Sequence, residues 1–173
     1  GSIIRYDNNQ KVLWKKNHYS KLEKKLKPKL NFVLVDQNLL ITDSISKYYS
    51  INVNSGELIW SKNNIYPFNS EIKKNKNKIF VVDYKNTLKC FNISDGSECW
   101  SLQTEDSFTI SNSQFSLIII DNLVVFTNPD SFNNNTGIIL GLYIIYLKNF
   151  LTLLNLGYDF SQDETEYHIY FLY

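Results

Sequence analysis

The chain has 173 residues, a formal net charge of +1, and 43% hydrophobic and 15% aromatic residues. This composition suffices for one hydrophobic core and excludes a wholly disordered chain. The chain contains 22 asparagines and 19 isoleucines but no alanine and no methionine. Because alanine is the strongest helix former, and because Ile, Tyr, Phe and Val favour strands, we predict an all-β protein.

Charge is unevenly distributed along the chain. Residues 1–80 contain fifteen Lys or Arg against six acids, a net charge of +9, whereas residues 81–173 contain three against eleven, a net charge of −8. The two cysteines provide neither a disulfide framework nor the spacing of a zinc site. Residues 1–7 lack the basic start and the apolar run of a signal peptide. These features therefore do not indicate a cellular compartment.

The predicted elements repeat along the chain. A partial unit spans residues 3–15, and residues 39–60 and 79–100 align with each other without a gap at an offset of 40. A weaker copy begins at residues 122–128, and the Asn-Thr-Gly sequence at 135–137 is a candidate for its turn. Such a period indicates a repeat architecture. The recurring positions, to which we assign structural roles, are Asp43 and Asp83, Asn52 and Asn92, Gly56 and Gly96, and Trp14, Trp60 and Trp100.

Each full unit is predicted to form four short antiparallel strands. Hairpins at residues 31–43, 70–83 and 114–127 supply the first two strands, and the recurring asparagine ends the third. Gly56 and Gly96 suit the left-handed position of the turn that leads to the fourth strand. A four-stranded unit that recurs about every 40 residues is typical of a β-propeller blade.

We therefore predict a partial β-propeller that forms one domain overall. A closed propeller needs at least four blades, so the chain is either a piece of a longer protein or completes its ring by self-association. The predicted parts are a partial first blade with a lysine-rich connection at 1–30, blades at 31–69 and 70–110, and one or more degenerate blades with C-terminal strands at 111–173.

The turn between the third and fourth strands predicts a register. If Val53 pairs with Glu57, then Ser50 lies opposite Trp60. The small residue leaves space that the indole fills, as close packing between neighbouring blades requires. We therefore expect the three tryptophans of the chain to be largely buried between blades.

The same register applies one repeat later. It places Cys90 opposite Trp100, and Cys99 opposite Phe91 on the other face of the sheet. A disulfide requires both side chains on one side of the hairpin. We therefore expect Cys90 and Cys99 to point apart and to remain reduced.

The segment Lys11–Lys29 contains eight lysines and one glutamate, with Trp14, His18 and Tyr19 among them. One interpretation is a surface that binds nucleic acid or an anionic membrane. The preferred interpretation is a solvated connection between blades, because a run of charge usually marks a wet surface. The scarcity of arginine argues further against nucleic acid.

No catalytic, cofactor-binding or metal-binding constellation emerges from the sequence. The acidic run Asp159–Glu166 fails the pattern of a calcium loop, because Glu164 stands where the turn glycine belongs. His18 and His168 are isolated from cysteines and from each other. The apolar stretch Ile138–Leu156 is interrupted by a lysine and an asparagine, so we predict two strands there in preference to a membrane span.

The repeats resemble those of quinoprotein-type β-propellers, the pyrroloquinoline-quinone-like family, over residues 3–128. The family pattern is Ala-Leu-Asp, a short turn, Thr-Gly, and then a tryptophan. The matching residues are Ser50, Ile51, Asn52, Ser55, Gly56 and Trp60 in one repeat, and Cys90, Phe91, Asn92, Asp95, Gly96 and Trp100 in the next.

The resemblance implies one of two functional branches. The dehydrogenases of this family bind the quinone with a stacking tryptophan, two adjacent cysteines and a calcium ion. This chain has no adjacent cysteines, and its tryptophans all occupy the repeat position. It therefore resembles most the other branch, a non-enzymatic lipoprotein subunit of the bacterial outer-membrane barrel-assembly machinery.

That branch implies a protein-interaction scaffold in the bacterial periplasm or cell envelope. Its partners would be other proteins, with no nucleic acid, small-molecule substrate or cofactor. The main alternative is a fragment of a quinone-dependent dehydrogenase whose catalytic residues lie on missing blades. A second alternative is an anion-binding module, for which Lys15, Lys16, Lys24 and Lys25 would supply the charge.

Overall fold

The computed structural model describes residues 1–103, 116–120, 123–128, 132–133, 137–138, 140–146, 153–158 and 168–171, and the side chains of residues 1–103, 116–120, 124 and 125. The predicted all-β class is confirmed. Apart from one five-residue helix, α1 (Lys21–Lys25), every helix or strand in these ranges is a strand.

The first three sheets follow the predicted repeat. A two-stranded sheet comes first, and each of the two sheets that follow has four antiparallel strands in sequence order. The first sheet consists of β1 (Ile3–Tyr6) and β2 (Val12–Lys16). The second consists of β3 (Leu30–Val35), β4 (Asn38–Asp43), β5 (Lys47–Asn52) and β6 (Leu58–Asn63). The third consists of β7 (Lys73–Asn75), β8 (Lys78–Val82), β9 (Thr87–Asn92) and β10 (Glu98–Gln103).

The C-terminal sheet departs from the repeat because it has five strands in the order β11-β12-β15-β16-β17. The two strands predicted within the apolar stretch 138–156 are confirmed as β15 and β16, which pair antiparallel. These strands are β11 (Leu117–Ile120), β12 (Leu123–Asn128), β15 (Leu140–Tyr146), β16 (Leu153–Tyr158) and β17 (His168–Phe171). Among the described residues no helix is long and apolar enough to cross a membrane.

Gly137 of the Asn-Thr-Gly sequence does not lie in the turn between the third and fourth strands of this sheet. Gly137 lies in β14 (Gly137–Ile138), which pairs with β13 (Phe132–Asn133) in a separate small sheet. That sheet lies in the connection between β12 and β15, the second and third strands. A match of three residues was therefore misleading, because pairing of β15 with β12 sets the place of the third strand. The acidic run 159–166 lies outside the described residues.

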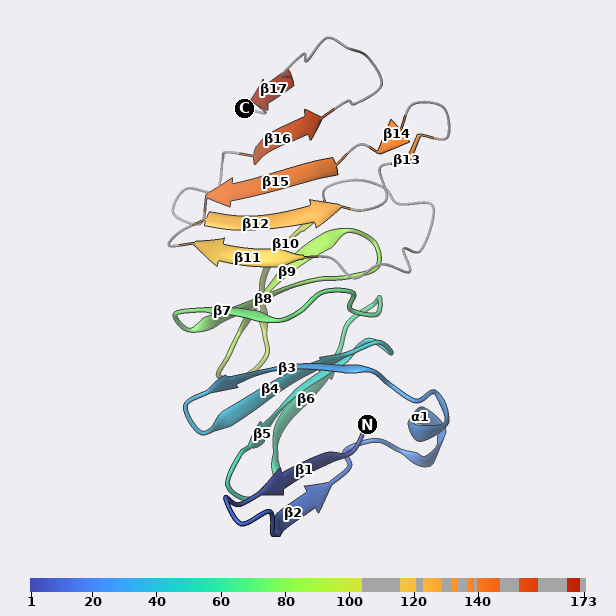
Figure 1. The fold of residues 1–173 in the computed structure, drawn as a ribbon, viewed down its shortest axis with the longest axis vertical. Coiled ribbons are helices and arrows are strands. Elements are labelled where there is room, and N and C mark those ends of the chain that lie inside the picture. Colours follow the sequence, from blue (N-terminus) through green and yellow to red (C-terminus); the bar gives the residue numbers. More distant parts are fainter. Residues whose placement is uncertain are drawn as a thin grey trace.

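The sheets follow one another along the long axis of the molecule, from β1 and β2 to the C-terminal sheet (Figure 1). Strand β7 contacts both β3 and β11, so the first strands of three successive sheets lie along one side of the stack. Antiparallel sheets that pack face to face in this way are the blades of a propeller. The predicted partial β-propeller is confirmed.

Left-handed backbone positions recur with the same offset as the sequence. Asp36 and Lys76, each with φ of 52°, begin the two-residue turns between the first two strands of the second and third sheets. A positive φ at this position is typical of the turns that match the twist of a hairpin. Ser46 and Asn86, with φ of 77° and 57°, form a second such pair in the next turn.

The turn glycines take the left-handed conformation, as predicted. Gly56 has φ of 72° and Gly96 has φ of 68°. The predicted pairing of Val53 with Glu57 is wrong, because the Asn52 N–H donates to the Glu57 carbonyl at 2.9 Å and closes a longer turn. A bulge at residue 59 then restores the predicted pairing of Ser50 with Trp60.

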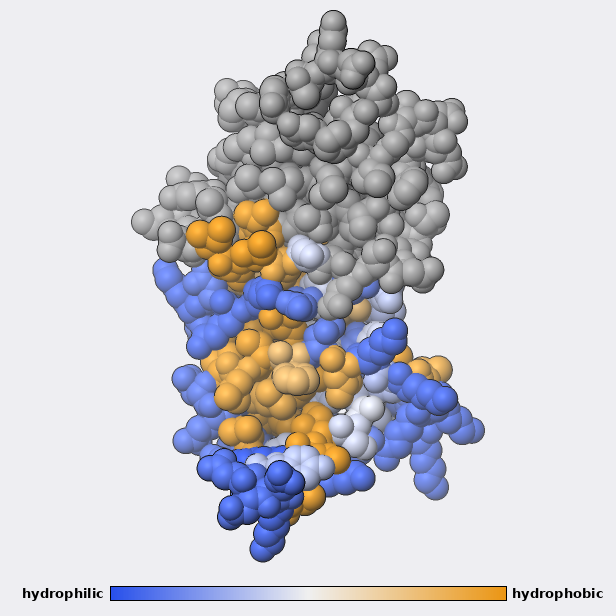
Figure 2. Space-filling model, viewed as in Figure 1, coloured by the Kyte–Doolittle hydropathy of each residue, from blue (hydrophilic) through white to orange (hydrophobic). Residues whose placement is uncertain are grey.

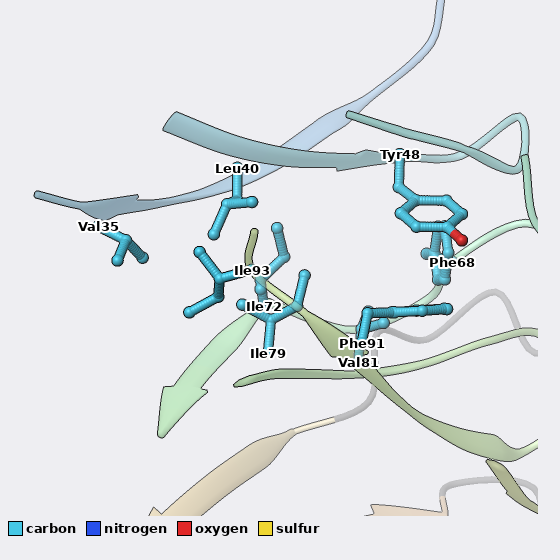
Figure 3. Close-up of a cluster of buried hydrophobic side chains, with 9 residues drawn as sticks. All are labelled: Val35, Leu40, Tyr48, Phe68, Ile72, Ile79, Val81, Phe91 and Ile93. Atoms are coloured by element: carbon cyan, nitrogen blue, oxygen red, sulfur yellow. The ribbon is translucent and has the colours of Figure 1, made fainter. Parts of the chain in front are cut away.

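The hydrophobic core consists of layers between successive sheets. Between the second and third sheets, Val35 and Leu40 meet Ile72 and Ile79, as Figure 3 shows. In the same layer the Tyr48 ring stacks on Phe91 with ring centroids 4.5 Å apart and meets the edge of Phe68. Both faces of β4 and β8 are buried, which explains their continuous apolar sequences. The layer between the first and second sheets contains Tyr19, Ile41, Tyr49 and Ile51. The layer between the third sheet and the C-terminal sheet contains Phe80, Val82, Leu88, Cys90, Leu117 and Val124.

Candidate functional site

The recurring tryptophans and glycines meet across the sheet boundaries. Trp14 of the first sheet packs on Gly56 of the second, and Trp60 of the second packs on Gly96 of the third. A Cβ atom added to Gly56 would lie 2.8 Å from Trp14 Cε3, and one added to Gly96 would lie 2.6 Å from Trp60 Cζ3. Glycine is therefore required here twice, by the positive φ and by the indole of the preceding sheet.

Hydrogen bonds fix the same contact. The Trp14 Nε1–H donates to the Val53 carbonyl at 3.1 Å, and the Trp60 Nε1–H donates to the equivalent Ile93 carbonyl at 3.1 Å. Arg5 donates to the Val53 carbonyl at 2.9 Å. All three tryptophans are half-buried and not fully enclosed. Trp100 packs in the next layer, with its ring 5.8 Å from that of Phe80.

The recurring aspartates close turns within their own sheets. Asp43 accepts from the N–H groups of Ile45 and Lys47, and Asp83 accepts from those of Lys85 and Thr87. Both carboxyls are almost completely buried, and burial raises the pKa of each above its ordinary value. These carboxylates therefore accept hydrogen bonds from the backbone at two equivalent turns.

The recurring asparagines act beside the glycine turns. Asn52 Oδ1 accepts from the N–H groups of Asn54 and Ser55, which holds the turn that follows β5. Asn92 Nδ2 donates to Ser97 Oγ across the corresponding turn of the third sheet. Side chains of this type commonly hold such turns by binding nearby backbone groups.

A polar and aromatic cluster lies between the first and second sheets. The Tyr19 hydroxyl donates to Asp43 Oδ2 at 2.6 Å, and Lys47 Nζ lies 5.0 Å from the centre of the Tyr19 ring. Burial raises the pKa of Tyr19 and lowers that of His18, whose ring lies 5.8 Å from the Tyr49 ring. From sequence, Tyr19 stood out only as an aromatic residue of the lysine-rich segment, and its hydrogen bond to Asp43 was not predicted because Tyr19 has no counterpart in the other repeats.

The cysteines lie on the same face of the third sheet, and the prediction that they point apart is wrong. Phe91 pairs with Glu98, and Cys90 pairs with Trp100, so Cys99 is the extra residue of a bulge. Both cysteines contribute to the layer beneath the C-terminal sheet. Burial, reinforced by the Cys99 thiol, raises the pKa of Cys90 to about 12. Both are free thiols.

The lysine-rich segment, residues 11–29, includes strand β2 of the first sheet and helix α1. Lys16 pairs with Glu57 at 2.6 Å, and Lys47, which lies on β5, pairs with Glu23 of α1 at 3.2 Å. Ser20 caps α1, since its side chain accepts from the Glu23 N–H while the Glu23 carboxylate accepts from the Ser20 N–H. Lys24 and Lys25 are exposed on this helix. The segment thus contains strand β2 and a short capped helix with exposed lysines.

Two of the apolar surfaces that are exposed among the described residues lie on the first strands of their sheets. The head surface consists of Phe32 and Leu34 of β3, which are 66% and 57% exposed, with the half-buried Leu30 and Leu39 beside them. The tail surface consists of Ile118 and Ile120 of β11, which are 54% and 55% exposed. Figure 2 shows apolar side chains at the level of β3 and again at β11, with hydrophilic residues between them. Large contiguous apolar patches mark interaction sites, which makes these two surfaces candidates for binding a partner.

An open hollow of about 360 Å³ lies next to the head surface. Its two charged residues, Glu71 and Lys73, pair with each other at 2.6 Å. Within the described residues no group of three His, Cys, Asp or Glu side chains could hold a metal ion. The residues that line the hollow are Leu30, Asn31, Phe32, Glu71, Ile72 and Lys73.

Comparison with known families tests the resemblance of the repeats. The family described as "Outer membrane protein assembly factor BamB" matches residues 1–142. The chain belongs to this family. No curated protein matches this BamB-family chain.

Solved structures support the fold of the BamB-family chain. BamB from Moraxella catarrhalis is 13% identical and superimposes with a TM-score of 0.63, covering 95% of this chain and 57% of its own. The WD40 domain of Neurospora crassa Pan2 is 17% identical and superimposes with a TM-score of 0.64. The superposition covers 92% of this chain and 47% of the Pan2 chain. A europium-containing methanol dehydrogenase is 11% identical and superimposes with a TM-score of 0.59. The superposition covers 74% of this chain and 25% of the dehydrogenase chain. The chain thus spans little more than half the length of the Moraxella protein.

Proposed function

We propose that this chain is a non-catalytic β-propeller scaffold for protein–protein interaction in outer-membrane protein assembly, in the bacterial periplasm or cell envelope. The observation that carries the proposal is the pair of apolar surfaces, head and tail, on a stack of closely packed sheets. A rigid stack holds such surfaces in fixed geometry, which lowers the entropic cost of binding a partner. Membership of the family supports outer-membrane protein assembly as the process in which the scaffold acts.

The polar and charged side chains that could take part in catalysis are instead engaged in structural contacts, which supports a scaffold function. Asp43 and Asp83 accept hydrogen bonds from backbone turns, Tyr19 donates to Asp43, and Glu71 is paired with Lys73. A catalytic site requires a nucleophile or base that faces a space where substrate can lie. The paired charges of the hollow do not provide one.

Site-specific photo-crosslinking tests the scaffold function. A photoreactive phenylalanine analogue at the tail position Ile118 should crosslink, in cell envelopes that contain the protein, to a component of outer-membrane protein assembly identified by mass spectrometry. The matched control is the exposed Lys62 on β6, away from both surfaces, which should give no such product. Equal products from both positions, or none from Ile118, would contradict the proposed function.

The dehydrogenase alternative has its own assay. Pyrroloquinoline quinone and calcium should give an absorbing holoenzyme that reduces an artificial dye if the chain is part of such an enzyme. We expect neither the spectrum nor dye reduction. If the spectrum and dye reduction were observed, the proposed scaffold function would be wrong and a redox function would take its place.

A further inference from the structure

Both cysteines of the chain lie in one hairpin of the third sheet, Cys90 on β9 and Cys99 on β10. Cys90 pairs with Trp100, and Cys99 is the additional residue of the bulge that precedes Trp100. In such a bulge two successive residues stand opposite one residue of the partner strand. Cys99 and Trp100 therefore both lie opposite Cys90.

The contacts of the side chains agree that both thiols lie on one face of this hairpin. Cys99 Sγ donates to Asn92 Oδ1 at 3.2 Å. Asn92 follows Cys90 by two residues on β9, and side chains two residues apart in a strand point to the same face. Cys90 and Cys99 also pack in one layer, together with Phe80. Burial raises the pKa of Cys90 most, and the neighbouring Cys99 thiol raises it further, so the two thiols interact.

This placement has the spacing that a disulfide requires. The Cα atoms of residues that face each other across antiparallel strands lie about 4.5–5.5 Å apart. The Cα atoms of a disulfide lie about 4.4–6.8 Å apart. Since the side chains share a face, we expect rotation of the side chains to suffice for bringing the two sulfur atoms together. The reason for expecting the thiols to remain reduced, that they point apart, no longer holds.

The second sheet has the same bulge without the thiols. Its residues Ser50 and Ile59 correspond to Cys90 and Cys99 at the repeat offset of 40, and its bulge likewise precedes a tryptophan, Trp60. The bulge is therefore part of the repeat, whereas the pair of thiols is specific to the third sheet.

The hairpin that carries the cysteines also receives the second sheet. Trp60 packs on Gly96 and donates to the Ile93 carbonyl at 3.1 Å. The Tyr48 hydroxyl donates to the Gly96 carbonyl at 3.1 Å. Strand β10 is an edge of its sheet and, among the described residues, pairs with β9 alone. A bond between the two cysteines would close the loop that contains this turn and oppose the separation of β10 from β9.

We propose that Cys90 and Cys99 form a thiol–disulfide site, at which a disulfide oxidant converts the two thiols into a bond across the hairpin β9–β10. The half-buried Cys99 attacks one sulfur of the oxidant, which releases the first thiol of the oxidant and leaves a mixed disulfide. The buried Cys90 then attacks Cys99 Sγ and releases the second thiol. The chain loses two electrons and two protons, and the oxidant gains both. The inference goes beyond the proposed scaffold function and does not depend on it.

Glutathione disulfide is a suitable oxidant for the test. Incubation of the reduced wild-type chain should lower its intact mass by two hydrogen atoms and leave no thiol to alkylate after denaturation. Cleavage after Lys89, Glu98 and Glu105 separates the two cysteines into the peptides 90–98 and 99–105. These peptides should remain joined until a reductant is added. Separate peptides, or a glutathione adduct with no joined peptides, would overturn the inference.

The matched control moves one thiol to the other face of the same strand. Cys99→Ser with Ser101→Cys keeps two cysteines, and position 101 is exposed and pairs with Lys89. Because residue 101 adjoins Trp100 in the strand, its side chain points away from Cys90. This variant should form a glutathione adduct but no joined peptides. An equal yield of joined peptides from this variant would count against the inference, because the bond would then not need a shared face.

Hydrogen exchange shows whether the bond holds the turn. The N–H groups of Asn92 and Gly96 donate within the turn between β9 and β10, and those of Asn52 and Gly56 do so in the equivalent turn of the second sheet. Oxidation should slow exchange at Asn92 and Gly96 and leave Asn52 and Gly56 unchanged. The melting temperature should rise on oxidation and return on reduction. Unchanged exchange at Gly96 in the bridged chain would refute the stabilising role of the bond.

Discussion

Replacement of Gly96 by alanine tests whether the repeat is held together by the contact between an indole and a turn glycine. The added methyl group meets two obstacles, a left-handed backbone with φ of 68° and an indole carbon 2.6 Å away. The backbone term costs about 1–2 kcal/mol for a residue with a Cβ atom. Overpacking against the ring costs a further ~1–3 kcal/mol. The free energy of unfolding should therefore fall by about 2–5 kcal/mol.

A double-mutant cycle separates the two terms. Trp60→Ala alone should lower the free energy of unfolding by about 3 kcal/mol, the lower end for a large core side chain, because Trp60 is only half-buried. In that background the indole is gone, so Gly96→Ala should cost only the backbone term of about 1–2 kcal/mol. The coupling between the two positions should thus be about 1–3 kcal/mol.

Urea unfolding measured by far-ultraviolet circular dichroism is the suitable assay, because tryptophan fluorescence changes when Trp60 is removed. The slope with urea should be similar for all four proteins, so that midpoints can be compared. Strictly additive losses would refute the reasoning. Glycine would then be required at this position by backbone conformation alone.

Three further predictions concern thiols, pH and charge. Iodoacetamide should modify Cys99 well before Cys90, because the pKa of Cys90 is raised to about 12, and equal rates by mass spectrometry would contradict this. Burial raises the pKa of Asp43 above its ordinary value of 3.8, so the folded state holds its proton more tightly, and stability should fall as pH rises from 3.8 through the folded-state pKa. The difference in unfolding midpoint between wild type and Asp43→Asn, followed from pH 3.5 to 7, should show this slope, and the opposite slope would refute the assignment. Heparin should not retain the protein in a salt-sensitive manner. Retention that disappears in the quadruple glutamine variant would instead favour the anion-binding alternative, the substituted residues being Lys15, Lys16, Lys24 and Lys25.

The sequence by itself determined the local architecture of this protein. The hairpins, the period of about 40 residues and the left-handed glycines follow from alternation and turn chemistry, which depend on residues close together in the chain. The pairing of Ser50 with Trp60 was also predicted correctly, but for an incomplete reason. The turn is longer than predicted, and the bulge at residue 59 shifts the register back by the same amount. The prediction that the two cysteines point apart was wrong, because the bulge at Cys99 places both thiols on one face of the sheet.

Only the tertiary structure decided what each face of a sheet meets. Trp60 was predicted to lie between blades, but its place on Gly96 depends on how two sheets dock, and no local pattern encodes that distance. Phe32 and Ile72 occupy the same position of the repeat, yet one is exposed and the other buried. The difference lies in the neighbouring sheet. Hydrophobic burial depends on what covers a residue in space, and in a stack of sheets that cover comes from residues tens of positions away.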